Sequence, residues 1–403
     1  MVDSEKKDIR KIFIAISLIA FAFGLFFNYQ ELWMKENGLS VKTISTVFSL
    51  CSLLTVSTLF FFSNVIKRSR LKKFATVLIL LDAISTFSLF ILNNTGFKVL
   101  IKFIIMFEYV VNTEMLACVY PIMSQIKKSD KLYAKKNLAY EGCKNAGIII
   151  AGFLLGKIVF SVNINYNFFC LVACILDIIS FFIFFSIRYD KYITNKQDEE
   201  KSDDNHILKE VKEYIKNDKI SLRYLAASLF NQISFNCIFG LNLILLTEVI
   251  KLELKFAITL STSLSIIAVV IGILVLHVFT SKNDYVNLSI KFGGRVIFYF
   301  ISLVTNYRIL FLICYIYGRL FSNSYDHISE APYVNRVDKK YQFAFCNLKT
   351  MLQYLGKSIG IFICGFTITL GLRFNLFFAL LFAALELLLR FDILRLKKIE
   401  TMS

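Results

Sequence analysis

The stretch "GCKNAGIIIAGFLLG" (residues 142–156) indicates how the chain is organised, because its pattern of small residues occurs again much later. Gly147, Ala151 and Gly156 follow the spacing small-x3-small-x4-small. The stretch "GKSIGIFICG" (356–365) has the same spacing, displaced by 209 residues. Small residues placed in this way let neighbouring helices pack closely in membranes. We therefore expect two similar halves built from helices.

Long apolar runs occupy most of the chain on both sides of that stretch. Of the 403 residues, 57% are hydrophobic and only 2 are proline. Runs of about 20 apolar residues are long enough to cross the ~30 Å hydrocarbon core of a membrane. The sequence predicts an all-α polytopic membrane protein with twelve spans, at residues 11–30, 41–66, 72–93, 98–126, 137–160, 166–188, 221–250, 256–281, 286–304, 307–334, 342–370 and 373–394.

The net charge of +17 is concentrated in alternate connections between the spans. Basic clusters such as "KRSRLKK" (67–73) and "KKSDKLYAKK" (127–136) alternate with nearly uncharged connections such as "SVNINYN" (161–167). This alternation is the positive-inside signal, so we expect the basic connections and both termini in the cytosol. This distribution also argues against nucleic acid as a binding partner of the basic residues.

One long polar segment divides the chain. It is "RYDKYITNKQDEEKSDDNHILKEVKEYIKNDK" (188–219), and six predicted spans lie on each side of it. We expect an N-terminal half at 1–188, a cytosolic central loop at 189–219 and a C-terminal half at 220–403. This organisation resembles that of major facilitator superfamily transporters. The stretch "FFFSNVIKRSRLKK" (60–73) keeps the basic cluster that the family has after its second span, with Asn64 where the family has aspartate.

The resemblance implies two pseudo-symmetric six-helix halves that expose a central site alternately to the two sides of the membrane. It implies a small-molecule substrate and no cofactor. We expect a multi-pass protein of the bacterial plasma (inner) membrane that acts as a monomer.

Charged residues are concentrated in the predicted span at 307–334. Arg319, Asn323, Asp326 and Glu330 are spaced by four, three and four residues, which places them on one face of a helix, with His327 beside them. Ionisable groups inside a membrane face protein or water rather than lipid. One interpretation is a buried salt bridge that serves structure. The other is a cavity-lining helix that relays protons.

The span at 98–126 carries Glu108 and Asn112, four residues apart on one face. When the two halves are superposed on their prolines, Glu108 falls on Arg319, and we expect these two to line one cavity and pair across it. The proton-coupling candidates are Asp326, Glu330, Glu108 and His327. The substrate-cavity candidates are Arg319, Asn323, Asn112, Asn28, Gln30, Gln232 and Asn236. Buried amides serve equally well as contacts between helices, and that alternative stays open.

Other ionisable residues occur inside the predicted spans, among them Asp82, Asp177, Arg295 and Glu386. For Asp177, Glu386, Lys144 and Lys349 the sequence favours a position near a helix end, from which the side chain reaches the lipid headgroups. The chain lacks a phosphate-binding glycine loop, so it gives no support for ATP as the energy source. With three histidines and nine scattered cysteines, we expect neither a metal site nor a disulfide framework.

These features predict a secondary active transporter driven by protons. The divergent motifs are similar to those of a bacterial efflux branch, which includes self-immunity exporters for small peptide antibiotics such as microcins. Our first hypothesis is therefore an antiporter that exports an antimicrobial peptide or drug-like compound and gives resistance or bacteriocin immunity. A proton-coupled uptake permease for a nutrient or metabolite is the rival. Two alternatives belong to other functional classes: an integral-membrane enzyme, such as an acyltransferase, and a receptor or scaffold that transports nothing.

Overall fold

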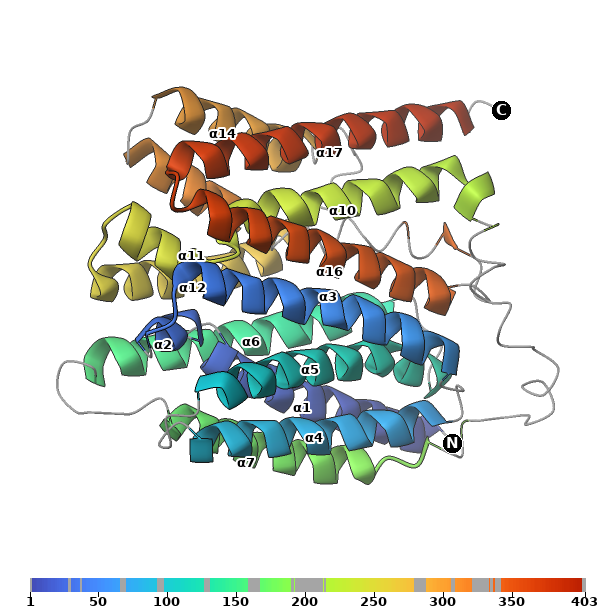
Figure 1. Ribbon diagram of the computed structural model, residues 1–403. Coiled ribbons are helices and arrows are strands. Elements are labelled where there is room, and N and C mark those ends of the chain that lie inside the picture. The colour runs from blue at the N-terminus through green and yellow to red at the C-terminus, as the bar shows by residue number, and fades with distance from the viewer. Residues whose placement is uncertain are drawn as a thin grey trace. The chain divides into compact units, whose positions relative to one another are not determined.

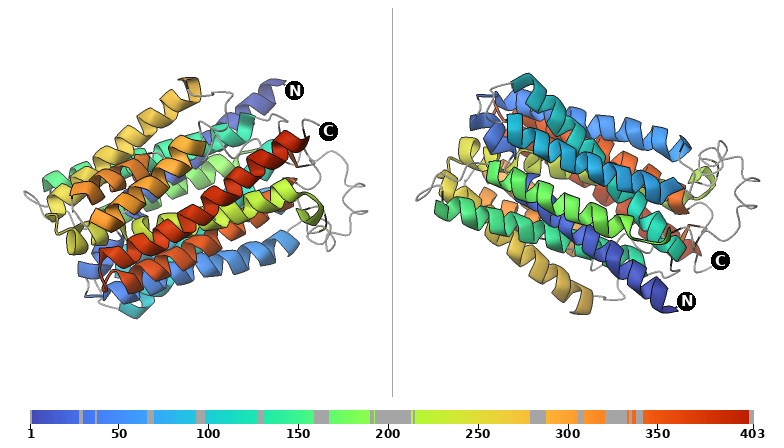
Figure 2. Two further views of the ribbon diagram at one scale, coloured as in Figure 1. Left: turned by 90° about the horizontal axis from the view of Figure 1, so that it is seen from above. Right: turned by 90° about the horizontal axis from the view of Figure 1, so that it is seen from below.

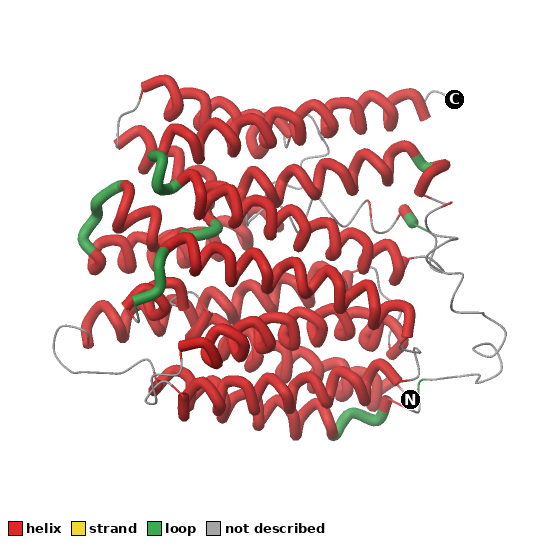
Figure 3. Tube along the Cα trace, in the orientation of Figure 1, coloured by secondary structure: helices red, strands yellow, loops and turns green. Residues whose placement is uncertain are grey.

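The protein is an assembly of long helices in the computed structural model (Figure 1). Every long segment that Figure 3 draws in colour is helical, and no strand occurs among these residues. The structure describes residues 2–27, 30–36, 38–65, 70–92, 98–126, 131–158, 167–189, 215–278, 288–305, 309–320 and 342–400, together with residues 192, 213, 333, 336 and 337.

The chain forms two compact units. The first consists of Met1–Trp33 and Ser57–Lys209, and the second of Met34–Val56 and Glu210–Ser403. The helices of the first unit are α1 (Val2–Phe27), α4 (Leu71–Leu92), α5 (Lys98–Ile126), α6 (Lys131–Ile158) and α7 (Asn167–Phe185). Within this unit α1 packs against α6 and α7, and α4 packs against α5 and α7.

The second unit contains the later helices. These are α10 (Lys219–Phe239), α11 (Asn242–Ile244), the π-helix η4 (Leu245–Val249), α12 (Leu254–Val278), the π-helix η5 (Ser289–Gly293), α14 (Gly294–Thr305), Ile309–Leu320, α16 (Gln342–Thr367) and α17 (Leu372–Glu400). Here α10 packs against α16 and α17, and α14 packs against α17. Figure 2 shows the red α17 alongside the yellow-green α10.

Two helices in the N-terminal part of the chain are divided between the two units. Helix α2 (Gln30–Glu36) and helix α3 (Val41–Val65) each contribute residues to both units. The part of α3 that belongs to the second unit contacts α16. The hydroxyl groups of Ser49 and Ser358 are 2.9 Å apart, and Ser45 lies against Gly365, where a Cβ atom has no room.

Four described segments are long and apolar enough to cross a membrane alone: Ser4–Lys35, Val41–Phe62, Leu71–Leu92 and Asn167–Phe185. A fifth is the pair Lys219–Phe239 and Asn242–Val249, bent by 44°. Helices α5, α6, α16 and α17 have at least 26 residues each but contain charged residues within them. The described helices overlap the predicted spans, but α1 begins at Val2 rather than at 11, α6 begins at Lys131 rather than at 137, and α17 ends at Glu400 rather than at 394. The number twelve stays a prediction.

The small-residue pattern lies where helices of one unit touch. A Cβ atom on Gly147 of α6 would collide with the backbone oxygen of Phe21 on α1, and one on Gly24 of α1 would collide with that of Lys144. In the second unit a Cβ atom on Gly356 or Gly360 of α16 would lie 2.6 or 2.7 Å from a backbone oxygen of α10. Both units therefore use the repeated glycines for the same kind of contact.

Candidate functional site

Three buried carboxyl groups lie on neighbouring helices of the first unit. Asp82 is on α4, Glu108 on α5 and Asp177 on α7, and these residues are 5%, 4% and 2% exposed. Because α4 packs against both other helices, the three side chains come into one region, which we call the acidic cluster. A carboxylate removed from water is costly unless a cation or several hydrogen-bond donors stabilise it.

Two of these carboxyls contact amides. Gln30 Nε2 donates to Glu108 Oε2 at 3.1 Å, and Asn112 Nδ2 donates to Asp82 Oδ2 at 3.2 Å. The amide oxygen of Gln30 has no hydrogen-bond partner within the described part of the chain. Both donors are neutral, so neither supplies the opposite charge that a carboxylate in a membrane requires.

The third carboxyl, of Asp177, lies near the hydroxyl of Thr86 on α4. That hydroxyl also lies 2.9 Å from the backbone oxygen of Asp82, to which it donates as in many helices. Oδ1 of Asp82 and Oδ1 of Asp177 are buried, and neither has a hydrogen-bond partner among the described residues. The carboxyls of Asp82 and Asp177 are therefore only partly satisfied by the described part of the protein.

The acidic cluster lacks a compensating positive charge in the described ranges. Glu108 feels the charge of Asp82, and Asp177 feels the charges of both. No described lysine, arginine or histidine forms an ion pair with any of the three. Like charges in a poorly solvated region repel strongly, so the three groups cannot all be ionised together without a high electrostatic cost.

The second unit has a buried polar network in which the carboxyl group is paired with cations. Arg295 on α14 forms an ion pair with Glu386 on α17, and its Nη1 donates to Asn231 Oδ1 at 2.8 Å. Arg390 Nη2 lies 3.4 Å from the other Glu386 oxygen, and its guanidinium is 4.6 Å from the centre of the Phe292 ring. This Arg–Glu network places two guanidinium groups against one carboxyl group and links α10, α14 and α17.

Three predicted site residues come together in the first unit: Glu108 belongs to the acidic cluster, and Gln30 and Asn112 contact it. In the second unit, Asn236 Nδ2 donates to the backbone oxygen of Gln232 at 2.8 Å and to its Oε1 at 3.2 Å. The amide nitrogen of Asn236 thus finds its acceptors on Gln232 within the same helix. Their assignment to a substrate cavity stays a prediction.

Arg319 lies half-buried on the helix Ile309–Leu320. The remaining predicted site residues fall outside the described residues: Asn28, Asn323, Asp326, His327 and Glu330. The polar face of the span at 307–334 and the pairing of Glu108 with Arg319 therefore stay predictions.

Three residues expected to reach the lipid headgroups are buried in protein instead. Asp177, Glu386 and Lys349 are 2%, 0% and 2% exposed. The fourth, Lys144, is partly exposed and forms an ion pair with Glu141. The expectation failed because hydropathy does not reveal which face of an apolar helix another helix covers. Sequence reasoning thus left Asp82 and Asp177 out of the candidate site.

Helix α10 is interrupted at its end, where the chain bends by 44° into α11. Just after the bend, Asn242 Nδ2 donates to Ser261 Oγ at 3.2 Å, and Asn242 Oδ1 accepts from the hydroxyl of Tyr315. Broken helices line substrate sites in many transporters, because the interruption frees backbone polar groups. Here three side chains from three helices hold the interrupted region in place.

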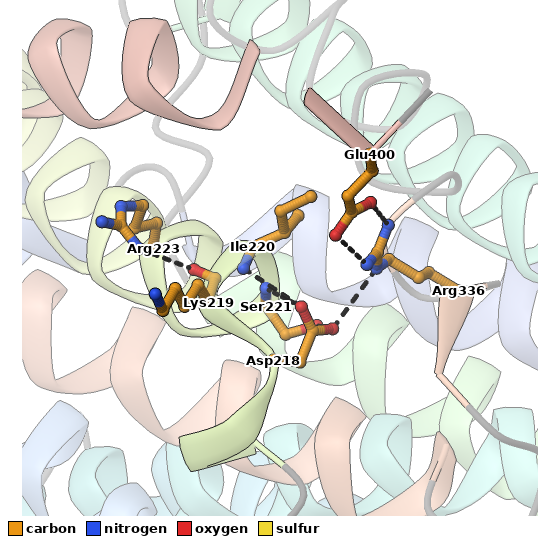
Figure 4. Close-up of polar contacts among 7 residues, drawn as sticks. All are labelled: Asp218, Lys219, Ile220, Ser221, Arg223, Arg336 and Glu400. Carbon is orange, nitrogen blue, oxygen red and sulfur yellow. Dashed lines mark hydrogen bonds and ion pairs between the residues drawn. The ribbon is translucent and has the colours of Figure 1, made fainter. Parts of the chain in front are cut away.

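A surface cluster lies at the N-terminus of α10 (Figure 4). The carboxylate of Asp218 accepts from the backbone nitrogens of Ile220 and Ser221 at 3.1 and 3.3 Å, which caps the helix. Arg336 Nε donates to Asp218 at 3.3 Å. The same guanidinium donates twice to Glu400, at 2.9 and 2.8 Å. Arg336 therefore joins the start of α10 to the end of α17.

The electrostatics of this surface cluster favour the charged form of Asp218. Burial alone would raise the pKa of Asp218, but the hydrogen bonds from Ser221 and the charge of Arg336 outweigh it and hold the pKa below its ordinary value. A cavity of ≈ 530 Å³ opens beside the cluster. It is lined by Asn217, Asp218, Lys219, Ile220, Arg336, Leu396 and Glu400.

The fold and the buried ionisable groups define a multi-pass helical membrane protein. The chain belongs to the major facilitator superfamily, because the model of the "Major Facilitator Superfamily" matches residues 12–325. Membership makes it a transporter of small molecules rather than an enzyme. No curated protein matches the chain.

Solved structures share this fold. The nucleoside transporter NupG superposes with a TM-score of 0.64 at 12% identity, covering 96% of this chain and 99% of that one. The human organic anion transporter MFSD10 (TETRAN) also superposes with a TM-score of 0.64, at 11% identity, with the same coverage of 96% and 99%. Identities this low establish the fold and leave the substrate open.

Proposed function

We propose that the protein is a secondary active transporter that couples the movement of its substrate to protons. Its main support is the environment of Glu108, which is buried in a membrane helix and held by the neutral amide of Gln30. A carboxyl group with a permanent role in structure is normally paired with a cation in such a place. A carboxyl without one is suited to binding and releasing a proton.

Protons enter and leave such a site when its access changes between the two sides of the membrane. Asp326, Glu330 and His327 remain proposed partners in this relay, because their sequence spacing places them on one helix face. Arg319 is proposed as their charge partner or as a contact for an anionic group of the substrate. The neutral amides of Asn28, Gln30, Asn112, Asn323, Gln232 and Asn236 are proposed to orient the substrate.

Export of a small antimicrobial peptide or drug-like compound is the direction that the divergent family motifs favour. In that role the protein is a proton antiporter of the bacterial inner membrane, with both termini in the cytosol, and protects the cell from the compound. The basic clusters at 67–73 and 127–136 support this orientation.

Transport in sealed vesicles tests the coupling. Substrate is first identified by expressing the protein in a sensitive strain and screening toxic peptides and drugs for raised tolerance. We then expect export of that compound to stop when an uncoupler collapses the proton gradient, and Glu108→Gln to lower coupled export at least tenfold. Glu253→Gln, an exposed residue before α12, is the matched control and keeps wild-type rates.

Two results contradict this function. Export that continues at full rate in the presence of uncoupler rules out proton coupling. Accumulation of the compound inside intact cells, in place of tolerance, reverses the direction and identifies an uptake permease.

A further inference from the structure

The acidic cluster is built from three helices of the first unit and combines a predicted residue with two that the sequence interpretation left aside. Asp82, Glu108 and Asp177 are each more than nine-tenths buried. We infer that these three carboxyls form one shared proton-binding site, in which the charge of each group controls proton binding by the others. This inference rests on the proposed function and names the site through which its protons pass.

The hydrogen-bond inventory of the cluster supports a bound proton. Asp82 and Glu108 each receive one neutral amide donor, although an ionised carboxylate has about four acceptor positions. Oδ1 of Asp82 and Oδ1 of Asp177 are buried acceptors with no donor among the described residues. A proton on a carboxyl removes the charge and supplies a donor at the same time.

Thr86 adds an independent constraint. Its hydroxyl carries a single hydrogen, and the backbone oxygens of Asp82 and Ala83 lie 2.9 and 3.1 Å away within the same helix. The Asp177 carboxyl also lies near this hydroxyl. Because the one hydrogen is committed to the backbone, Thr86 has little left to offer a charged Asp177. Together with the unpartnered Oδ1, this leaves Asp177 short of donors for a permanently charged carboxylate.

The groups around the cluster offer no alternative charge. On α7, the thiols of Cys170 and Cys174 lie near Glu108 and Asp177 respectively. Residues 12–27 of α1, the part of that helix beyond its charged N-terminal turns, contain no titratable side chain. On α6, Glu141 and Lys144 form a pair with each other, and α2 contributes Glu31, which is acidic too.

The spacing of the carboxyls favours protons over a metal ion. No group of three His, Cys, Asp or Glu side chains is arranged to hold a metal within the described ranges. The three carboxyls are nevertheless close enough to feel one another's charge. Repulsion acts over longer distances than coordination, so this arrangement couples proton binding without forming a metal cage.

Infrared difference spectroscopy of the full-length protein in lipid tests the site, with the proton itself as the probe. We expect a carboxylic-acid C=O band that moves in D2O and disappears as the pH rises. Asp82→Asn, Glu108→Gln and Asp177→Asn each remove part of the band. In each variant the pH at which the remainder disappears shifts by about one unit or more, because the groups interact. Glu253→Gln is the control and leaves the band unchanged.

Three outcomes overturn the inference. The first is a carboxylic-acid band that none of the three substitutions alters, and the second is a band that loses intensity in a variant while the pH at which the rest disappears does not change. The third is a band that sodium ions remove and choline does not. If Asp177→Asn does not fold, Thr86→Val replaces it, and an unchanged titration in that variant counts against the site. The spectra require no transported compound. If the coupled band is present but transport resists the uncoupler, the proton-binding site is retained and the proposed proton-coupled function is rejected.

Discussion

Asp177 in the first unit and Glu386 in the second occupy matching places in the repeat, yet their surroundings are opposite. Glu386 comes 209 residues after Asp177, the same displacement that relates the two glycine patterns. Glu386 contacts two arginines, whereas Asp177 contacts the hydroxyl of Thr86. The comparison teaches how a cationic neighbour changes the role of a buried carboxyl. With such a neighbour the carboxyl ties helices together, and without one, as we infer, it exchanges a proton.

Physical chemistry explains why these roles exclude each other. A buried ion pair keeps both charges fixed, since removal of either partner leaves the other stranded in a region of low polarity. A carboxyl that must change its charge during a transport cycle cannot have such a partner permanently. The two units therefore use one position of the repeat for structure in one case and, as we infer, for proton binding in the other.

The largest expected effect comes from the paired carboxyl. Glu386→Gln removes the negative charge that Arg295 and Arg390 contact, and we expect a loss of about 3–5 kcal/mol in stability, as for other broken buried pairs. Asp177→Asn should change stability far less, because it removes no ion pair. Thermal unfolding of both variants in the same detergent measures the difference. Equal losses at the two positions would break the comparison.

A moderate effect is expected where both units behave alike. Gly147→Ala forces a Cβ atom against the backbone of α1, and Gly360→Ala forces one against α10. Because backbone cannot yield as a flexible side chain does, each should cost about 1–3 kcal/mol. Gly142→Ala is the matched control, since no atom lies within 4 Å of the added Cβ. Unfolding temperatures read out all three, and a control as unstable as the others would refute the packing explanation.

A smaller effect is expected at the cap of α10. Asp218→Ala removes the acceptor for two backbone nitrogens and should cost about 1 kcal/mol at pH 7. Since the folded-state pKa of Asp218 is lowered, its contribution is complete above the ordinary value of 3.8 and is lost as the pH falls through the folded value. The gap between wild type and variant should therefore close only in acid. A gap that closes between pH 5 and 8 would contradict this assignment.

The smallest effect tests a neutral buried contact beside the charged ones. Tyr315→Phe removes the hydroxyl that donates to Asn242, and hydrogen bonds between membrane helices are worth about 0.6 kcal/mol on average. We expect a shift in unfolding temperature that is small next to that of Glu386→Gln. A loss as large as that of the ion pair would show that polarity alone, without charge, stabilises the second unit.

The sequence was informative where one signal dominates. Long apolar runs placed the helices, because a membrane helix must satisfy its backbone internally, and repeated glycines identified the close helix contacts. The acidic cluster was found only in part. Glu108 was recognised as an ionisable group inside a span, but its contact with Gln30 joins residues 78 positions apart. No local pattern encodes that distance.

For Asp177 the sequence contained a signal that the prediction of the site did not use. Its helix is apolar on every side, so periodicity gives no direction for the one acidic residue. The displacement of 209 residues to Glu386 was a usable signal, since it relates two acidic residues in matching spans. Their different partners, however, come from Thr86 and Arg295, which lie far from them in the chain. Only the packed helices bring these partners together.

The glycine contact between α1 and α6 should keep the distance between these two helices constant while other parts of the transporter move. With Gly24 and Gly147 allowing the two backbones to touch, these helices have no room to slide without separating. Ile14 on α1 and Ile150 on α6 are exposed, so each can be replaced by a labelled residue. Their separation should stay constant throughout a transport cycle, and motions measured elsewhere can be calibrated against it.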